Sequence, residues 1–207
     1  MSTRVVLATR NGHKVVELRE ILADLLRDRD IDLGTAIVSI ADVSDAPDVV
    51  ESGVTFAENS LLKARAACLA TGLPALADDS GLAVDVLGGA PGIFSARWSG
   101  GGGDAANVHL LLSQLGDVPD GHRGAEFVCA ATLVTPAGDE FVEHGRLRGV
   151  LERAPRGHGG FGYDPILRVD ATRTLAELSA TEKNAVSHRG NALRALAPRV
   201  VEVLTKV

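Results

Sequence analysis

The sequence predicts an α/β fold in which helices pack against a mixed β-sheet. Three observations predict this class. Helical patterns occupy both ends of the chain, residues 127–134 are apolar as in a central strand, and residues 135–139 form a turn into a second strand at 141–144. A hairpin between helical segments adds an antiparallel strand pair. We therefore expect a mixed sheet rather than a purely parallel one.

Length and composition restrict the class of protein. A chain of 207 residues is long enough for one substantial core or for two lobes that share a sheet, and we treat residues 1–207 as a single domain. The 45% apolar and 23% charged content is that of a soluble globular protein. A net charge of −6 and 3% aromatic residues argue against a nucleic-acid surface, which needs a basic stripe or stacking rings.

Targeting signals and cysteine usage indicate the compartment. No apolar run reaches membrane-spanning length and no charged-then-apolar leader opens the sequence, so we expect a cytoplasmic protein that does not bind membranes. Cys68 and Cys129 lie far apart, each in an apolar run. We interpret both as small core residues in a reducing compartment, with no disulfide or metal role.

The first strand, turn and helix have the layout of an anion site. A β-branched run at 4–8 leads through a polar turn at 9–14 into a helix with apolar residues at three- and four-residue spacing. Backbone N–H groups, the positive end of the helix dipole and the charge of Lys14 would meet there. The equally weighted alternative is that Thr9 or Asn11 only caps the helix.

A second strand and a strong helix follow. The strand is predicted at 36–40, and most acids of the next stretch, up to Glu51, should lie in a solvated loop. A helix opens at Thr55, where Glu58 three residues later fits a capping box. Lys63 lies on a different face from the apolar stripe of this helix, which should end at Gly72.

Two carboxylates and a hydroxyl stand at the centre of the sequence. Asp78, Asp79, Ser80 and Gly81 lie between apolar runs at 73–77 and 82–87. We expect a turn here, with Gly81 allowing the chain to bend. If strand geometry instead persists, the two aspartates point to opposite faces. One carboxylate beside a hydroxyl suits a hard cation, whereas the alternative is a turn with both acids in solvent.

Two polar clusters lie in the C-terminal third, beyond a helix predicted at 107–115. Residues 156–165 place glycines around Phe161 and Tyr163, which indicates either a segment held close to a flat ligand or a buried aromatic turn. Residues 181–190 precede a last helix, and Ser187 could be only its N-cap. His188 and Arg189 at the positive end of that helix favour an anionic or carbonyl-bearing ligand nearby.

Together these clusters resemble the inosine triphosphate pyrophosphatase family, enzymes that remove dITP, ITP and XTP. The resemblance spans nearly the whole chain and rests on five motifs in the same order: residues 9–14, Glu58 to Ser60 with Lys63, residues 77–82, residues 160–165, and residues 182–184 with 187–189. Five motifs in register are far more specific than any one of them.

The resemblance implies a fold, a cofactor and site residues. It implies two lobes with a substrate cleft between them, a homodimer, and Mg²⁺ at Asp79, which would also be the general base. Glu51 is a second candidate metal ligand. The implied substrate contacts are Thr9, Arg10, Asn11, Gly12, His13, Lys14, Lys63, Ser80, Phe161, Gly162, Tyr163, Asp164, Lys183, His188 and Arg189. The family commonly has glycine where Arg10 stands, so either the backbone differs there or Arg10 adds a phosphate contact.

Residue chemistry fits this interpretation. A nucleoside triphosphate carries about four negative charges, which a divalent ion, Lys14 and Lys63 would offset while a water, oriented by Asp79, attacks phosphorus. Cleavage between the α and β phosphates yields the monophosphate and pyrophosphate. The donor-only Arg189 would pair with the 6-carbonyl of hypoxanthine or xanthine and disfavour adenine, whereas the residues that reject guanine are not evident. Phe161 or Tyr163 would stack on the base.

Two rival functions differ from this hypothesis. A nucleotide-binding sensor would keep the pocket without chemistry, but it would not need the carboxylate of Asp79 beside a metal. A Maf-type nucleotide pyrophosphatase would act on modified pyrimidines or 7-methylguanine. Residues 160–165 and 187–189 argue against that second rival.

Overall fold

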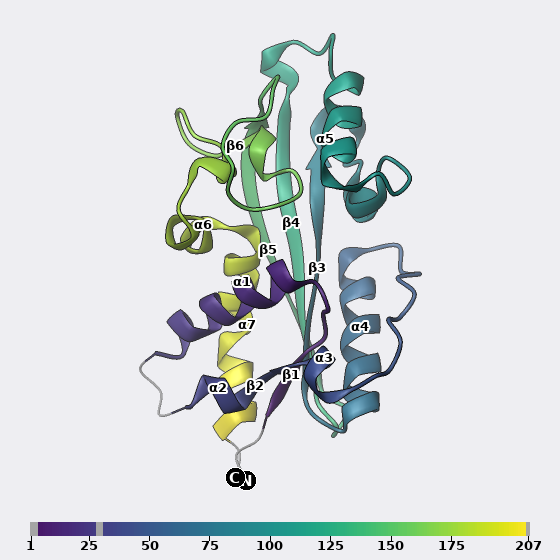
Figure 1. Cartoon of the computed structure of the whole chain (residues 1–207), viewed down its shortest axis with the longest axis vertical. Coiled ribbons are helices and arrows are strands. Elements are labelled where there is room, and N and C mark those ends of the chain that lie inside the picture. The colour runs from purple at the N-terminus through teal and green to yellow at the C-terminus, as the bar shows by residue number, and fades with distance from the viewer. Residues whose placement is uncertain (1–3, 28–30, 206–207) are drawn as a thin grey trace. The chain divides into compact units, whose positions relative to one another are not determined.

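The computed structural model describes residues 4–27 and 31–205, and within them the sheet has six strands in the order β2, β1, β3, β4, β5, β6 (Figure 1). Strand β1 pairs in parallel with β2 and β3, whereas β5 pairs antiparallel with β6. The predicted mixed sheet is therefore confirmed. The strands are β1 (Val5–Leu7), β2 (Ile37–Ser39), β3 (Ala75–Val84), β4 (Gly124–Val134), β5 (Glu140–Leu151) and β6 (Leu167–Arg168).

Helices lie between the strands and after the last strand along the chain. The α-helices are α1 (Gly12–Leu25), α2 (Leu33–Ala36), α3 (Ile40–Val43), α4 (Phe56–Thr71), α5 (Gly103–Gln114), α6 (Ala180–Val186) and α7 (His188–Thr205). Short 3-10 helices are η1 (Asp85–Leu87), η2 (Gly92–Arg97), η3 (Asp120–His122), η4 (Asp164–Ile166) and η5 (Leu175–Glu177).

The chain divides into two compact units. The first comprises Met1–Asp79, Cys129–Gly145 and Arg189–Val207, and the second comprises Ser80–Val128 and Arg146–His188. Neither is one continuous stretch, because β3, β4 and β5 each contribute residues to both. The single domain and the two-lobe substrate cleft stay predictions.

Alternation along the strands sorts the core of the first unit onto two faces. Leu7 and Leu76 pack with apolar residues of α1 and α7. Val6, Ala75 and Ala77 pack with apolar residues of α4. Because successive strand residues point to opposite faces, even-numbered residues of β3 in this unit face α1 and α7, and odd-numbered ones face α4. This parity decides where the two aspartates point.

The second unit has its own core and an unusual buried cation. Leu82, Phe127 and Tyr163 pack there with the apolar face of α5. The guanidinium of Arg123, 2% exposed, donates hydrogen bonds to the carbonyl oxygens of Leu115, Leu151 and Glu152 at 2.7, 2.9 and 3.0 Å. Arg123 therefore joins backbone carbonyls at the end of α5 to those at the end of β5.

Helix α4 begins and ends where the sequence predicts. The hydroxyl of Thr55 accepts the N–H of Glu58 at 3.1 Å, and Gly72 ends the helix at a φ of +66°, which favours glycine. The Glu58 carboxylate accepts the N–H of Val54 at 2.6 Å, so it caps one residue earlier than a capping box would.

The predicted turn at Gly81 is wrong. Asp78, Asp79, Ser80 and Gly81 lie inside the ten-residue strand β3, and Gly81 has no positive φ. The strand joins the end of the first apolar run to the start of the second: residues 75–77 are buried in the cores of unit one, and Leu82 and Val84 in the core of unit two. The polar residues between the two buried parts are therefore also strand residues.

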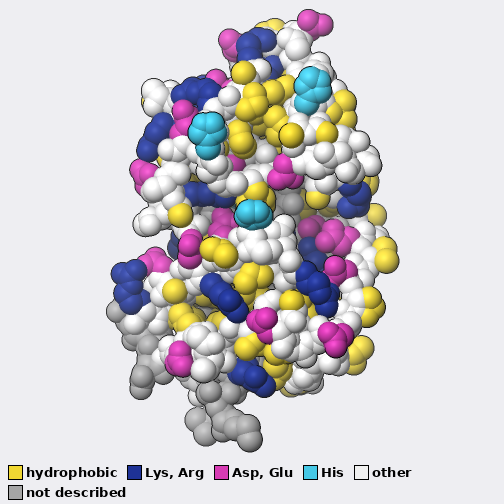
Figure 2. Space-filling model, in the orientation of Figure 1, with side chains coloured by type: hydrophobic (Ala, Val, Ile, Leu, Met, Phe, Trp, Pro, Cys, Tyr) yellow, Lys and Arg dark blue, Asp and Glu magenta, His cyan; other side chains and the backbone are white. Residues whose placement is uncertain are grey.

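The surface charge, the helices and the cysteines can be compared with what the sequence predicts. Figure 2 shows Lys and Arg side chains interspersed with Asp and Glu over the face it presents. Across the part of the chain that the structure describes, none of the helices combines the length and apolar character that a bilayer crossing requires. Cys68 and Cys129 are free and buried, as predicted.

Candidate functional site

The candidate site of the first unit is built on the alternation of β3. Asp78 continues the even-numbered series with Leu76, so its carboxylate faces α1 and α7. Asp79 continues the odd-numbered series with Ala77, so its carboxylate faces α4. Two neighbouring aspartates therefore belong to two different charge clusters.

Asp78 lies in a buried network of two cations and two anions. Its Oδ2 accepts hydrogen bonds from Lys14 Nζ at 3.0 Å and from Arg189 Nε at 3.1 Å. Arg189, which is 1% exposed, also forms an ion pair with Glu17 of α1. Burial alone would raise the pKa of Asp78, but Arg189, Lys14 and Lys63 outweigh it and hold that pKa well below its ordinary value. Asp78 is therefore a fixed anion.

Asp79 shares one ammonium group with Glu51. Lys63 Nζ donates to Asp79 Oδ1 at 3.0 Å and to Glu51 Oε1 at 3.1 Å. Burial raises the pKa of Asp79 above its ordinary value, although Lys63 and Lys14 pull it down. Burial would lower the pKa of Lys63, but Asp79, Asp78 and Glu51 raise it, so the ammonium stays charged.

The pair of Asp79 and Glu51 fits a magnesium ion. Both carboxylates converge on one cation, the Lys63 ammonium, so their oxygens already surround a positive charge. Within residues 4–27 and 31–205 no cluster of three or more His, Cys, Asp or Glu side chains could hold a metal. Mg²⁺ does not require such a cage, because it usually keeps several waters and binds one or two carboxylates together with substrate phosphates.

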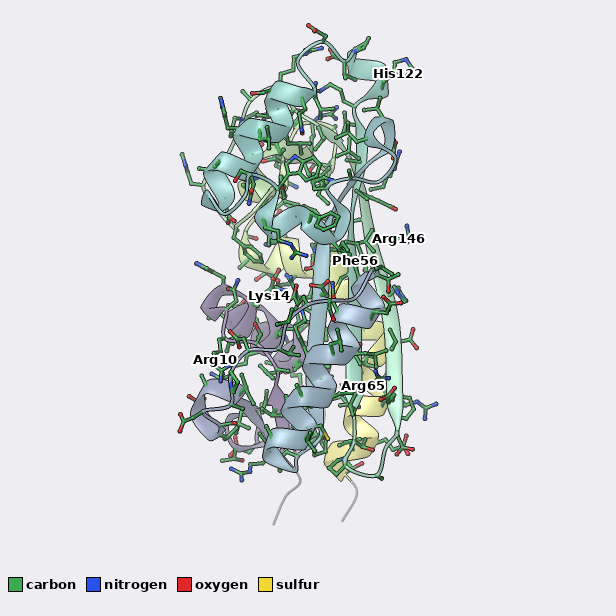
Figure 3. The ribbon with its side chains drawn as sticks, turned by 90° about the vertical axis from the view of Figure 1, so that its right-hand side faces the viewer. Arg10, Lys14, Phe56, Arg65, His122 and Arg146 are labelled. Carbon is green, nitrogen blue, oxygen red and sulfur yellow. The ribbon has the colours of Figure 1, made fainter. Side chains whose placement is uncertain are left out.

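The turn at 9–14 leads into α1 through a side-chain cap. Asn11 Oδ1 accepts the N–H groups of His13 and Lys14 at 3.0 and 3.3 Å, and Thr9 Oγ1 accepts the N–H of Asn11 at 3.2 Å. Asn11 thus caps the helix, and whether the turn also binds an anion stays a prediction. The Lys14 side chain, labelled with Arg10 in Figure 3, reaches Asp78 by its ammonium group.

The predicted base-binding segment of the second unit is organised around Asp164. Its Oδ2 accepts the N–H of Phe161 and the ammonium of Lys183, both at 2.8 Å. The Lys183 Nζ also lies over the Phe161 ring, 4.9 Å from its centroid. Gly160, at a φ of +73°, is required because a Cβ would lie 2.1 Å from Asp164 Oδ2.

The two aromatic candidates for base stacking differ in exposure. The Tyr163 side chain is buried in the core, and its hydroxyl donates to the Ser95 carbonyl oxygen at 2.9 Å. Phe161 is only partly buried. Of the two, Phe161 alone has a ring that a ligand could reach. Gly162 between them donates its N–H to Asp104 at 2.7 Å.

The remaining predicted residues are divided between the chain's two units. Ser80, partly buried, and the buried His188 belong to the second unit, where the His188 ring stacks on Phe127 with centroids 4.6 Å apart. Arg189 belongs to the first unit. Sequence reasoning missed Glu17, although it follows Lys14 by three residues and so shares a helix face with it.

The family model described as Ham1 family matches residues 5–199. The chain belongs to the Ham1 family. A dITP/XTP pyrophosphatase of Streptomyces avermitilis is 60% identical over 204 residues, covering 98% of this chain and 99% of that protein. The structure of a HAM1 protein from Coxiella burnetii matches with a TM-score of 0.83 at 42% identity, covering 97% of this chain and 99% of that chain.

A second solved Ham1 protein gives the same result. The Staphylococcus aureus Ham1 structure matches with a TM-score of 0.82 at 36% identity and covers 97% of this chain and 99% of that one. The resemblance inferred from the five sequence motifs is therefore confirmed at the level of family and fold. The roles of individual site residues stay predictions.

Proposed function

We propose that this Ham1 family protein hydrolyses the non-standard purine nucleotides dITP, XTP and ITP to their monophosphates and pyrophosphate. The observation that carries the proposal is a relative, 60% identical over almost the full length of both chains, that is named a dITP/XTP pyrophosphatase. The convergence of Asp79, Glu51 and Lys63 supports it. Enzymes of phosphoryl transfer use carboxylates to bind a metal ion, and the metal and nearby cations offset the charge of the phosphates.

Asp79 and Glu51 would hold Mg²⁺. The ion would offset the negative charge of the phosphates and of the transition state. Lys63 and Lys14 add two fixed ammonium groups to the same unit. Lys14 is held by Asp78, so its charge is positioned before a nucleotide binds.

Asp79 is the residue we assign as general base. Its side chain is 10% exposed, and burial raises its pKa, which increases its affinity for the proton of an attacking water. Asp78 is unsuited to that role because its pKa is held low and its Oδ2 already accepts two hydrogen bonds. The two aspartates therefore divide between proton transfer and positioning.

Base recognition is proposed for residues of both sequence clusters near the C-terminus. Phe161 offers a partly exposed ring, and Lys183 beside it is donor-only, which suits a carbonyl oxygen at position 6 of the purine better than the amino group of adenine. The guanidinium of Arg189 also lacks acceptors, but in this structure it binds Asp78 and Glu17. Its contact with the base stays a prediction.

We also infer a cytoplasmic homodimer that does not bind nucleic acid. The family resemblance supports the dimer, and the net charge of −6 supports the absence of nucleic acid. Two buried free cysteines fit a reducing compartment. Sedimentation equilibrium tests the assembly, and a single species of monomer mass would contradict it.

The deciding experiment is product analysis with a panel of nucleotides. ITP, dITP, XTP, ATP, GTP and dTTP are incubated with the protein and Mg²⁺, then with EDTA, and pyrophosphate is separated from orthophosphate. We expect pyrophosphate from ITP, dITP and XTP alone, and its loss with EDTA. Orthophosphate would place cleavage at the terminal bond. Tight ITP binding without turnover would favour a nucleotide sensor.

A further inference from the structure

The segment that carries Glu51 has no regular structure of its own. Residues 44–54, between α3 and α4, contain neither helix nor strand. A carboxylate on such a segment is not fixed by a backbone hydrogen-bond ladder, so its position depends on side-chain anchors. The structure contains one anchor at each end of the segment.

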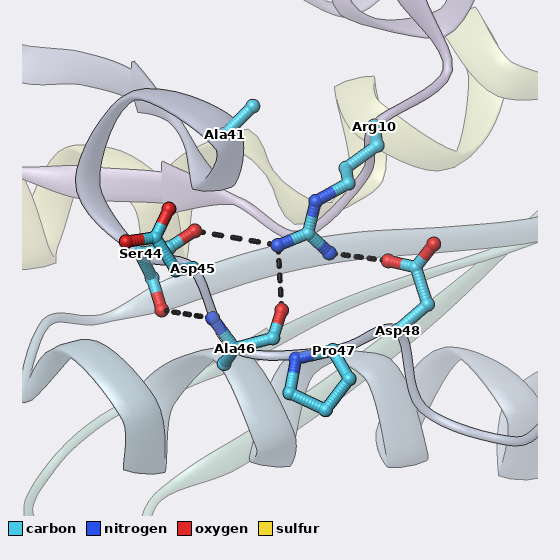
Figure 4. A pocket seen from close by; sticks show the side chains of 7 residues that line it. All are labelled: Arg10, Ala41, Ser44, Asp45, Ala46, Pro47 and Asp48. Atoms are coloured by element: carbon cyan, nitrogen blue, oxygen red, sulfur yellow. Dashed lines mark hydrogen bonds and ion pairs between the residues drawn. The ribbon is translucent and has the colours of Figure 1, made fainter.

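The first anchor is Arg10, which follows β1 in the turn at 9–14. Its guanidinium forms an ion pair with the Asp48 carboxylate, and its Nη2 donates to the carbonyl oxygens of Ala46 at 2.6 Å and Ser44 at 3.3 Å. Figure 4 shows the guanidinium directed into a shallow pocket that these residues line with Ala41. The Arg10 side chain thus binds three residues of the segment.

The second anchor is the first turn of α4. Asn59, fully buried, accepts the N–H of Gly53 at 2.8 Å, and Glu58 accepts the N–H of Val54 at 2.6 Å. A Cβ at Gly53 would lie 2.6 Å from the Glu58 Cβ, so only glycine permits this close approach. Glu51 is held between the two anchors, with its carboxylate on Lys63.

We propose that Arg10 is a positioning residue that keeps the Glu51 carboxylate beside Asp79. The guanidinium is engaged by Asp48 and by two backbone carbonyls of the segment. Arg10 therefore acts on the metal carboxylate through the segment instead of adding a phosphate contact. The role of Glu51 as a ligand rests on the proposed function.

Hydrogen exchange tests whether Arg10 orders residues 44–54, and it needs no turnover. The N–H groups of Ser52, Gly53 and Val54 all donate hydrogen bonds, so their exchange rates report the order of the segment. We expect Arg10→Ala to accelerate exchange at these amides by about threefold or more, and Asp48→Asn to do so by less because the carbonyl contacts remain. Arg19→Ala is the matched control. Arg19 is also an arginine on the first unit, but its ion pair with Asp42 is long, at 3.8 Å between Nη2 and Oδ2, and both side chains are exposed.

Metal binding tests the functional part. Mn²⁺ is titrated into each variant in the absence of nucleotide and bound metal is measured by electron paramagnetic resonance. We expect weaker Mn²⁺ binding by about threefold to tenfold for Arg10→Ala, with a smaller change for Asp48→Asn and none for Arg19→Ala.

Three other outcomes would overturn the proposal. Unchanged exchange in Arg10→Ala would show that the segment does not depend on Arg10. Faster exchange with unchanged Mn²⁺ binding would separate the segment from the metal site. Weaker nucleotide binding in Arg10→Ala alone, with a neutral Asp48→Asn, would assign Arg10 to a phosphate. A wild-type protein that fails the product assay would contradict the proposed function while leaving the exchange result standing.

Discussion

Two adjacent aspartates acquire opposite pKa shifts because one peptide unit separates two environments. Asp78 faces Lys14 and Arg189, and those cations overcome the effect of burial on its pKa. Asp79 faces Lys63 together with Glu51, and there burial prevails. The strand alternation that usually separates core from solvent here separates a structural anion from a candidate base.

At the residue scale, the first prediction concerns Asp79. Asp79→Asn removes the proposed proton acceptor and one proposed metal ligand while keeping a similar shape, so turnover of ITP should fall by about 10²-fold to 10⁴-fold or more. Nucleotide binding, measured by calorimetry, should be largely retained. Asp85→Asn is the matched control, since Asp85 is an exposed aspartate paired with Arg148. Equal loss of binding and turnover in Asp79→Asn would make Asp79 a binding residue only.

The second residue-scale prediction concerns Asp78. Asp78→Ala leaves Arg189 and Lys14 in a buried cluster with one anion fewer, and breaking a buried pair in this way costs about 3–5 kcal/mol of unfolding free energy. Asp85→Ala should cost only about 0–1 kcal/mol, because its pair with Arg148 is largely exposed. Urea unfolding measures both. Comparable small losses would contradict the assignment of Asp78 as a structural anion.

Part of the candidate site could be predicted from the sequence. The family resemblance pointed to Asp79, Lys63 and Glu51, of which Glu51 lies outside the five motifs, and the structure brings these three together. The burial of Tyr163 was not evident, because a tyrosine among glycines reads equally as a stacking surface or as a core residue. Which partners Arg189 contacts depends on α1 and β3, which are remote from it in sequence.

At the element scale, the elements that were predicted correctly are those with local signals in the sequence. Helix α4 was predicted from its cap and its terminal glycine, both of which are local signals. The continuity of β3 was only the alternative to a predicted turn, because the cations that pair with Asp78 and Asp79 come from other elements and leave no local signal in the sequence. The short helices α2, α3 and α6 were missed, since four to seven residues give too few turns for a periodic pattern.

The third prediction concerns the start of α6. Its capping box joins Ser179 and Glu182, and the Ser179 N–H, with Arg173, lowers the pKa of Glu182 from 4.5 to about 2. A carboxylate with a lowered pKa stabilises the fold fully above its unfolded pKa, and that contribution is lost as pH falls through the folded value. Glu182→Gln should therefore lower the thermal midpoint at pH 7, with the difference from wild type shrinking between pH 4.5 and 2.

Thermal melts of both proteins at several pH values measure this difference. Glutamine keeps an acceptor for the Ser179 N–H, so the comparison isolates the charge of Glu182. A difference that stays constant down to pH 2 would show that the charge contributes nothing and that only the shape of the side chain matters.

At the scale of the whole molecule, the division into two units does not correspond to two separable segments. The chain passes between the units within β3, β4 and β5, and again between His188 and Arg189 at the start of α7. If the part of β3 in one unit unfolds, the part of the same strand in the other unit loses its continuation. This connectivity favours cooperative unfolding as one domain.

The fourth prediction is a single unfolding transition reported by one probe in each unit. Trp98, the one tryptophan in the sequence, lies in the second unit, and both cysteines, Cys68 and Cys129, lie in the first. Burial raises the pKa of Cys129 to about 12, so its thiol should resist alkylation until the first unit opens. Tryptophan fluorescence and pulsed alkylation are followed across a urea series. Coincident midpoints are expected for one cooperative domain, whereas alkylation that precedes or follows the fluorescence change would show that the two units unfold independently despite their shared strands.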